Sequence, residues 1–349
     1  MGIDRKLKAK YLDRAVSAID LESAKTISEL VEDFASASIQ ARSLARCVDV
    51  YRNMLEDKDR PVIILGLSGA LIAGGLRKVI RDMVKFGLID VIVSTGAVLY
   101  QDFYQARGYR HYVGHPMMDD VELRSLYIDR IYDTLVDEEG FEKTDRFIAR
   151  ITESLPARGF SSREYIEILG SYAKDDSSIL NAAYQRGIPV FAPALNDSSI
   201  GIGLTIYYAH TAAARRMWID PIRDNHEMVQ IILKSKKTAV IYIGGGVPKN
   251  WINDAEVMAA YAFDQSIDGH TYAFQVTTDA PHWGGLSGST LEEAQSWGKV
   301  SSRATKSTVY CEATIALPLI VGAVMQRGYA KKRKPLSFKW KGDKLVSLK

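Results

Sequence analysis

The sequence has few cysteines and no long apolar run. Cys47 and Cys311 are the two cysteines in 349 residues, and their distant positions do not form a metal-binding or paired pattern. No stretch reaches the roughly 18 apolar residues that a membrane-spanning helix needs. The charged N-terminus also lacks the apolar core of a secretory signal. We therefore expect no disulfide framework, no membrane span and a cytoplasmic location.

Metal and nucleic-acid sites also have little support. His111 and His115 stand four residues apart, but no further ligand completes the pattern, so we expect no metal site. The net charge is +3, and residues 329–349 hold eight Lys or Arg against one acid, which leaves the preceding chain slightly acidic. On charge grounds we therefore expect no nucleic-acid binding. The basic tail could meet an acidic partner, but Phe338 and Trp340 among its lysines favour packing against protein.

Alternating strands and helices make up most of the chain. Residues 1–57 have helical periodicity, and residues 98–175 are expected to be mostly helical. Short β-branched runs indicate strands over residues 61–67, 89–95, 188–194, 238–246, 272–279 and 307–313. Strand–helix–strand units of this kind build parallel sheets. We expect an α/β fold: a single large Rossmann-like domain (58–328) with a doubly wound, mostly parallel sheet. A helical N-terminal segment (1–57) precedes it, and a basic tail (329–349) follows.

Small residues follow the strands where parallel sheets bind ligands. The strand ending in Gly244, Gly245 and Gly246 is followed at once by a helix start, and helix N-termini favour phosphate. The turn around Ser68 and Gly69 resembles the dinucleotide pattern G-x-G-x-x-G without matching it, so a plain tight turn remains an alternative. Asp197 follows another strand and could either cap a helix or hold a ribose hydroxyl or an amine. These loops predict a nucleotide crevice at the carboxyl edge of the sheet.

The stretch TLEEAQSWGKV at residues 290–300 contains an amine beside an indole and a carboxylate. If this stretch is helical, Glu293 and Trp297 share a face, and Lys299 follows directly. Such a set could seat an amine or imine. Lysine acts as a nucleophile only when its ammonium form is disfavoured. A solvated surface lysine is the alternative.

Five segments, in this order, resemble deoxyhypusine synthase: SGALIAGGLRKVIRDMVKFGLIDVIVST, IPVFAPALNDSSIG, IYIGGGVPKN, EEAQSWGKV and VYCEATIALPLI. The resemblance extends from about Pro61 to about Met325. The run EEAQSWGK is the most specific part, because the family's catalytic lysine lies in such a run. The resemblance implies a Rossmann-like, NAD-dependent homotetramer with active sites at subunit interfaces.

The resemblance also implies a reaction. NAD takes a hydride from spermidine to give an imine, and the amine of Lys299 attacks it and releases 1,3-diaminopropane. The aminobutyl group then passes to a lysine of a translation-factor precursor as the hydride returns, so the net reaction is transfer of an alkyl group. The related homospermidine synthase uses putrescine as the acceptor. Both acceptors remain open for this chain.

By matching position, Lys299 would be catalytic, and Asn250, Glu293 and Trp297 would line the amine pocket. The cofactor site would comprise Ser68, Gly69, Ala73, Thr95, Gly96, Asp197, Gly244, Gly245, Thr278, Glu312 and Ala313.

The chain departs from the family where polyamine nitrogens are held. The family has acids, and in one case a histidine, at the positions of Tyr100, Gln101, Ile202, Trp283, Leu286 and Asn250. Each charged hydrogen bond lost costs about 1.5–3 kcal/mol. Asp102, Asp279 or Glu292 could compensate. We expect NAD and the lysine chemistry to be kept with a changed donor or acceptor. An idle NAD-binding scaffold is the alternative, and the retained Lys299 argues against it.

Overall fold

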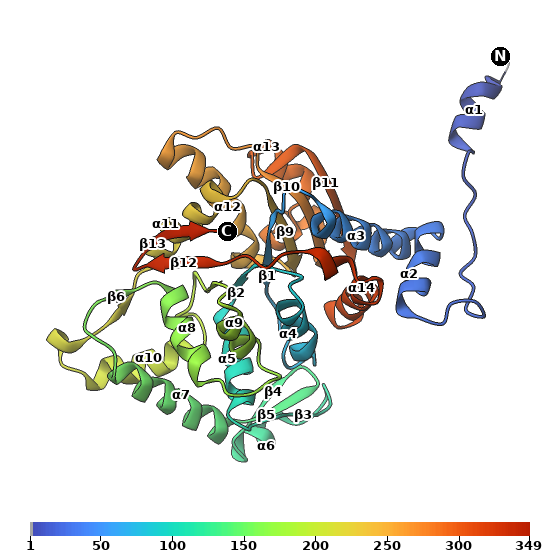
Figure 1. The fold of residues 1–349 in the computed structure, drawn as a ribbon. Helices are drawn as coiled ribbons and strands as arrows, with labels where there is room; N and C mark the ends of the chain where they lie inside the picture. The colour runs from blue at the N-terminus through green and yellow to red at the C-terminus, as the bar shows by residue number, and fades with distance from the viewer. Residues whose placement is uncertain (1–2) are drawn as a thin grey trace.

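A six-stranded parallel sheet forms the centre of the computed structural model, which describes residues 3–349. Its strand order is β11-β10-β9-β1-β2-β7, and every neighbouring pair is parallel. The strands are β1 (Val62–Leu67), β2 (Val91–Ser94), β7 (Val190–Phe191), β9 (Thr238–Ile243), β10 (His270–Thr277) and β11 (Val300–Tyr310) (Figure 1). The α/β fold with a mostly parallel sheet is thereby confirmed. β11 begins seven residues before the expected strand, directly after Lys299.

Helices cover both faces of this sheet. Successive residues of β1 point to opposite sides, so Ile63 and Leu65 join one buried cluster while Val62 and Ile64 join the other. The first cluster includes side chains of α3 (Ile39–Glu56), α4 (Arg77–Lys85), α5 (Gly96–Ala106), α7 (Glu138–Glu153), α8 (Ser162–Tyr172), α9 (Ile179–Arg186), α10 (Ser199–His210) and α14 (Ala313–Arg327). The second includes α11 (Pro221–Lys234), α12 (Gly246–Phe263) and α13 (Leu291–Ser296). Burial on both faces explains why the strands read as continuous apolar runs.

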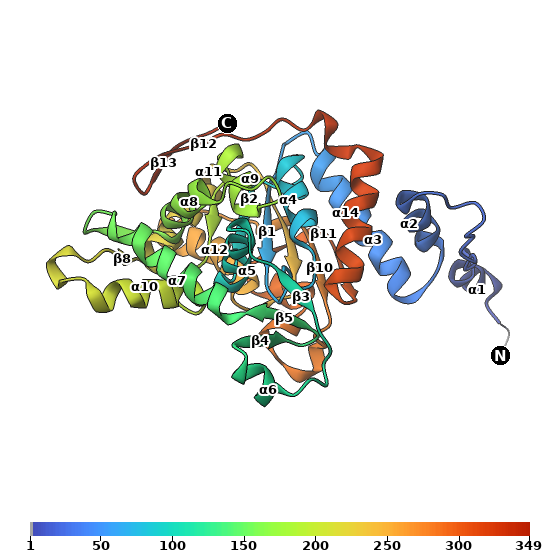
Figure 2. The same cartoon turned by 90° about the horizontal axis from the view of Figure 1, so that it is seen from below.

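The N-terminal segment is only partly helical. α2 (Ile27–Ser36) and α3 pack against each other and against α14. α1 (Arg5–Tyr11) has no buried residue, and both views show it standing away from the body (Figures 1 and 2). Residues 12–26 form no helix, which corrects the expectation that residues 1–57 are helical.

A small antiparallel sheet lies where mostly helix was expected. It comprises β3 (His111–Val113), β4 (Ile128–Ile131) and β5 (Thr134–Asp137), in the order β3-β5-β4, with α6 (Asp120–Ser125) beside it. These strands have three or four residues each, too few to show a clear period-2 pattern. A second short pair joins β6 (Gly159–Phe160) to β8 (Trp218–Ile219). Single 3₁₀ turns occupy η1 (Ala213–Arg215), η2 (Pro281–Trp283), η3 (Leu286–Gly288) and η4 (Tyr329–Lys332).

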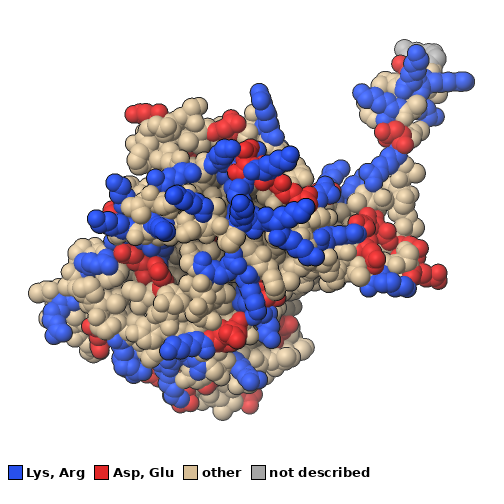
Figure 3. All heavy atoms as spheres, viewed as in Figure 1, with Lys and Arg blue, Asp and Glu red and all other residues tan. Residues whose placement is uncertain are grey.

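The basic C-terminal segment ends in a hairpin that packs on the chain's own body. It consists of β12 (Phe338–Lys341) and β13 (Lys344–Leu348), which contact the second cluster through Phe338 and Trp340. The side-chain amide of Gln230 on α11 donates to the Asp343 carbonyl at 2.7 Å and accepts from the Leu345 amide at 2.9 Å. Outward-facing lysines of β12 add to the basic side chains gathered on this face (Figure 3).

A buried cluster of three charges fastens the segment before the hairpin. Arg60 donates to both carboxylate oxygens of Asp90, at 3.0 and 2.8 Å, and Arg333 donates to the same carboxylate. The Ile63 amide also donates to Asp90, at 2.9 Å. Burial favours the protonated acid, but the charges of Arg333 and Arg60 outweigh burial and lower the pKa of Asp90. Arg333 is therefore a structural anchor and not part of a solvated tail.

Candidate active site

A hollow of about 560 Å³ opens at the carboxyl ends of β1, β9, β10 and β11. This volume is within the range of small-molecule and cofactor pockets. Its lining includes most of the cofactor positions expected from sequence: Ser68, Gly69, Ala73, Gly244, Gly245, Thr278, Glu312 and Ala313. Loops from four parallel strands converge here because their carboxyl ends share one edge of the sheet.

The glycine turn after β9 is closed tightly against two serines. A Cβ on Gly244, whose φ is +72°, would lie 2.4 Å from Oγ of Ser68. A Cβ on Gly245 would lie 2.5 Å from Cα of Ser287. The Gly245 amide donates to Oγ of Ser68 at 2.9 Å, and the Gly246 amide donates to Oγ of Ser287 at 3.0 Å. The turn therefore needs glycine for space as well as for backbone conformation.

A buried lysine ties the loop around η3 to the start of α12. Nζ of Lys249 donates to Oε1 of Gln275 at 3.0 Å and to the carbonyls of Ser287 and Ser289 at 3.4 and 2.5 Å. Burial lowers the pKa of Lys249 to about 8. Sequence reasoning assigned no role to Lys249, because lysine in a helix start is usually exposed.

Another part of the lining comes from residues 131–134, which the sequence analysis did not assign to the site. Residues 131–134, at the turn between β4 and β5, line the hollow, including Tyr132 and Asp133. Tyr132 adopts a φ of +57°. The carboxylate of Glu312 accepts from the Thr314 amide at 2.8 Å and so caps α14 while facing the hollow. No sequence signal places the turn at residues 131–134 at this edge, because it is far along the chain from all four strands.

Thr95, Gly96 and Asp197 lie outside this lining. A Cβ on Gly96 would lie 2.3 Å from Oγ of Ser198, so the end of β2 packs on the loop before α10. Ser198 is the N-cap residue of α10, which corrects the capping alternative for the exposed Asp197. Gln101 connects α5 to the hollow, because its Oε1 accepts from the Ala73 amide at 3.3 Å.

A second group of side chains lies beside α12. It consists of Lys299, Asp254, Asn250 and Trp297, and we call it the Lys299 group. Nζ of Lys299 lies 2.9 Å from Oδ1 of Asp254, 3.4 Å from Oδ1 of Asn250 and 5.2 Å from the ring centre of Trp297. The structure thus brings together Asn250, Trp297 and Lys299, three residues that the family resemblance assigns to one site. Asp254 was not predicted, because a carboxylate eight residues beyond the glycine turn matched no motif. Glu293 is exposed on the first turn of α13.

The amine of Lys299 does not line the 560 Å³ hollow beside Gly244 and Gly245, which we call the glycine hollow. Along α12, a rise of 1.5 Å per residue puts Asp254 roughly 12 Å from Gly246. In this conformation the ammonium is paired with a carboxylate, whereas the lysine chemistry needs an amine whose ammonium form is disfavoured. A nucleophilic role of Lys299 would therefore require that its amine first leave Asp254.

Of the three acids expected to compensate, only Asp279 lines the hollow. Asp102 is fully buried and accepts from Nε of Arg77 at 2.7 Å and from Oγ of Ser178 at 2.6 Å, so it has a structural role. Glu292 lies 3.5 Å from Nζ of Lys306. The expectation for Asp102 is wrong because its carboxylate points into the core.

Four of the residues that stand at the family's acidic positions have aromatic or aliphatic side chains. The hydroxyl of buried Tyr100 donates to the Phe141 carbonyl at 3.0 Å. Ile202, Trp283 and Leu286 are exposed. None of these four side chains can supply a negative charge to an amine.

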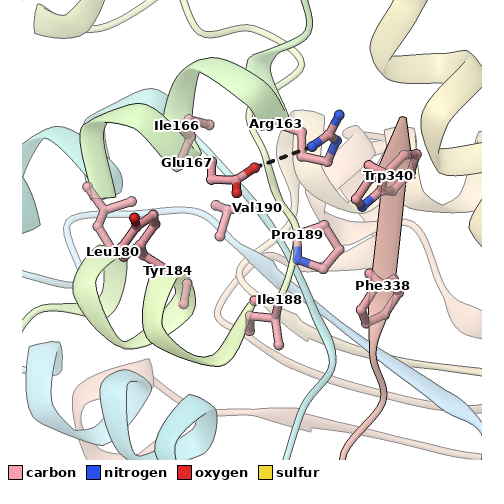
Figure 4. A pocket seen from close by; sticks show the side chains of 12 residues that line it. Arg163, Ile166, Glu167, Leu180, Tyr184, Ile188, Pro189, Val190, Phe338 and Trp340 are labelled. Atoms are coloured by element: carbon pink, nitrogen blue, oxygen red, sulfur yellow. Dashed lines mark hydrogen bonds and ion pairs between the residues drawn. The ribbon is translucent and has the colours of Figure 1, made fainter. Parts of the chain in front are cut away.

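A second hollow, of about 90 Å³, lies beneath the C-terminal hairpin (Figure 4). Phe338 and Trp340 face α8 and α9 across it. The guanidinium of Arg163 stacks on Trp340 at 4.2 Å and pairs with buried Glu227, with Nε 2.6 Å from the carboxylate. This hollow is too small for a nucleotide and reflects the packing of the hairpin.

Within residues 3–349, the structure contains no cluster of three or more metal-ligating side chains. No helix in the same range has the length and apolar character to cross a membrane.

Comparison with known proteins gives the family. The family model described as deoxyhypusine synthase matches residues 29–324. The chain is 43% identical over 325 residues to a "probable deoxyhypusine synthase 2" of Methanosarcina mazei, covering 91% of this chain and 92% of that protein. It is 42% identical over 340 residues to a "deoxyhypusine synthase-like protein" of Coxiella burnetii, covering 95% of each.

The chain belongs to the deoxyhypusine synthase family. A solved structure of a candidate deoxyhypusine synthase from Entamoeba histolytica shares the fold, with a TM-score of 0.61 and 20% sequence identity. The match covers 89% of this chain and 97% of that one. The glycine hollow and the Lys299 group together contain most of the residues that the resemblance to deoxyhypusine synthase assigns to the active site.

Proposed function

We propose that the protein is an NAD-dependent transferase of aminoalkyl groups in which Lys299 carries the transferred group. The observation that carries this proposal is the pairing of two features within one family member. A glycine-walled hollow lies at the sheet edge, and Lys299 lies beside Trp297 and beside Asn250, which is on the helix that starts at that hollow.

The residues of the hollow fit a dinucleotide. Gly244 and Gly245 form a turn without side chains of its own at the edge of the hollow, and Ser68 and Ser287 pack against it. α12 begins at Gly246, and its N-terminus favours a phosphate. Ser68 and Thr278 offer hydroxyls, and Glu312 offers a carboxylate for ribose hydroxyls. When bound, NAD would supply an acceptor for a hydride from an amine carbon and would later return it.

Lys299 would form the covalent link to the transferred group. Its amine would attack the carbon of the oxidised donor, release the remaining amine and hold the aminoalkyl group as an imine. An acceptor amine would then displace Lys299. The face of Trp297 would shield the group and attract its remaining ammonium. In keeping with the family resemblance, we propose a cytoplasmic homotetramer whose sites are completed at subunit interfaces.

The donor and acceptor are proposed to differ from those of a typical family member. The positions of Tyr100, Ile202, Trp283 and Leu286 cannot hold ammonium groups by charge, so a polyamine such as spermidine would have fewer ionic contacts. The acceptor would be either a translation-factor precursor or a small amine such as putrescine, as in homospermidine synthase. The presence of Asn250 and Trp297 around Lys299 favours an enzyme over an idle NAD-binding scaffold.

The test is chemical trapping. The protein is incubated with NAD and single polyamines, reduced with borohydride and examined by mass spectrometry for an adduct on Lys299. We expect an adduct that requires both NAD and an amine, and none with Lys299→Arg, which keeps the charge but not the nucleophile. Absence of an adduct with every donor, despite NAD binding, would contradict the proposal. Product analysis with putrescine then separates the two acceptor classes.

A further inference from the structure

The Lys299 group forms a complete binding site for one ammonium ion. The carboxylate of Asp254, the amide oxygen of Asn250 and the face of Trp297 all lie around Nζ of Lys299. Carboxylates, carbonyl-type oxygens and indole faces are the groups that bind alkylammonium ions in proteins. In this structure the chain's own lysine takes that site.

The site is held in shape independently of Lys299. Nδ2 of Asn250 donates to Oδ2 of Asp254 at 2.8 Å, so one oxygen of the carboxylate is fixed by the neighbouring turn of α12. Oδ1 of Asp254 is then left to meet an ammonium. Both residues are on a continuous helix, and therefore the carboxylate keeps its place when Lys299 moves.

The site is open to a second ammonium. The side chain of Asp254 is 41% exposed and Trp297 is 66% exposed, whereas the side chain of Lys299 is only 15% exposed. An amine from solution can thus reach the carboxylate and the indole face, while Lys299 lies beneath them. The Lys299 backbone is held by hydrogen bonds with Ala294 and His270, so only the side chain has to move.

We propose that Asp254 is the residue that recognises the substrate amine, and that a primary ammonium of the substrate displaces Lys299 from it. The exchange keeps Asp254 paired but takes the carboxylate away from the mostly buried Lys299 ammonium. Loss of that partner disfavours the ammonium form, so the Lys299 proton can pass to solvent and leave the neutral, nucleophilic amine. Asp254 is thus a specificity-determining residue that couples amine binding to release of the nucleophile. This inference rests on the proposed role of Lys299 and adds a recognition residue to it.

The favoured substrate is an alkylamine with a primary ammonium at one end. One carboxylate with one free oxygen matches a single ammonium group. The exposed Trp283 and Leu286 provide no charge for further ammonium groups. A neutral diol of the same length would not compete with Lys299.

The exchange can be measured without turnover. The intact protein is trace-labelled with an acylating reagent, and mass spectrometry gives the ratio of labelling at Lys299 to that at Lys306. Lys306 is a suitable internal reference because it pairs with Glu292, at 3.5 Å. Asp254→Asn should raise the ratio about twofold to fivefold, since it removes one part-exposed ion pair that favours the unreactive ammonium. The matched control Glu292→Gln should not raise labelling at Lys299.

Adding 1,4-diaminobutane should raise the ratio in the parent protein and leave it unchanged in Asp254→Asn. Butane-1,4-diol should leave it unchanged in both. A ratio that fails to rise with the diamine, or that rises equally in Asp254→Asn, overturns the inference.

The borohydride adduct separates this inference from the proposed function. In Asp254→Asn, the adduct on Lys299 should still form, but its half-saturating amine concentration should rise at least about tenfold because a charge-assisted contact is lost. Asp254→Glu should restore part of this loss. An adduct formed by Asp254→Asn at the parent's amine concentration overturns the role of Asp254 and leaves the transferase intact. No adduct in the parent protein defeats both.

Discussion

Replacing Gly245 by alanine should open the glycine hollow. The new Cβ would lie 2.5 Å from Cα of Ser287, whereas non-bonded carbons sit about 3.5–4.0 Å apart. The loop around η3 must therefore move by about 1 Å or more. The φ of Gly245 is −158°, outside the left-handed region, and the clash with Ser287 is the expected cause of the change.

The expected loss follows from the contacts of Ser287. Its hydroxyl accepts from the Gly246 amide, and its carbonyl accepts from Gln275 at 2.9 Å and from Lys249 at 3.4 Å. At about 1 kcal/mol net for each hydrogen bond, Gly245→Ala should lower the free energy of unfolding by about 2–3 kcal/mol. A displacement of this size should also weaken NAD binding at least about tenfold, because positioning in a preformed site is sensitive on this scale.

Gly246→Ala is the matched control. Gly246 has a φ of +59° with no atom within 4 Å of an added Cβ, so this substitution introduces backbone strain alone, worth about 1 kcal/mol. Denaturant unfolding and calorimetric titration with NAD should place Gly246→Ala between the parent protein and Gly245→Ala. Equal NAD affinity in the parent and Gly245→Ala, or equal loss in the two variants, would refute the reasoning.

Two further predictions concern buried charges. Asp90→Ala leaves two guanidinium groups without their shared carboxylate, and should lower the free energy of unfolding by about 3–5 kcal/mol in denaturant titration. The exposed acid in Asp49→Ala should cost less than about 1 kcal/mol, and a similar loss in both variants would count against the argument. Because burial lowers the pKa of Lys249 from 10.5 to about 8, the folded protein binds fewer protons than the unfolded chain between these values. Stability should therefore rise with pH from about 8 to 10.5 in the parent relative to Lys249→Met, and parallel pH profiles of unfolding would exclude this effect.

Local sequence patterns predicted the central sheet well. β1, β2 and β9 are mostly apolar runs buried on both faces, so their sequence and their burial share one cause. The amino-terminal part of β11 was missed, since residues 300–306 mix serine, arginine and lysine and pair along only one edge. The three strands β3, β4 and β5 were missed because they are short and depend on one another for pairing.

The candidate site was also predicted only in part. Glycine turns and the EEAQSWGK run were visible as motifs, and the structure places Gly244 in the hollow and Lys299 beside Trp297. Their separation was not visible, because a motif does not state how far a strand end lies from a helix flank. The ion pair with Asp254 and the burial of Lys249 likewise join residues that no motif connects.

The sequence by itself determined an α/β chain of the deoxyhypusine synthase type. Its hydrophobic periodicity, its glycine turns and the EEAQSWGK segment are each visible within a short stretch of residues. Only the tertiary structure decided which charges meet: Arg333 with Asp90, and Lys299 with Asp254. Such pairs form between residues that are tens to hundreds of positions apart, and their energies depend on burial and geometry that exist only once the chain has folded.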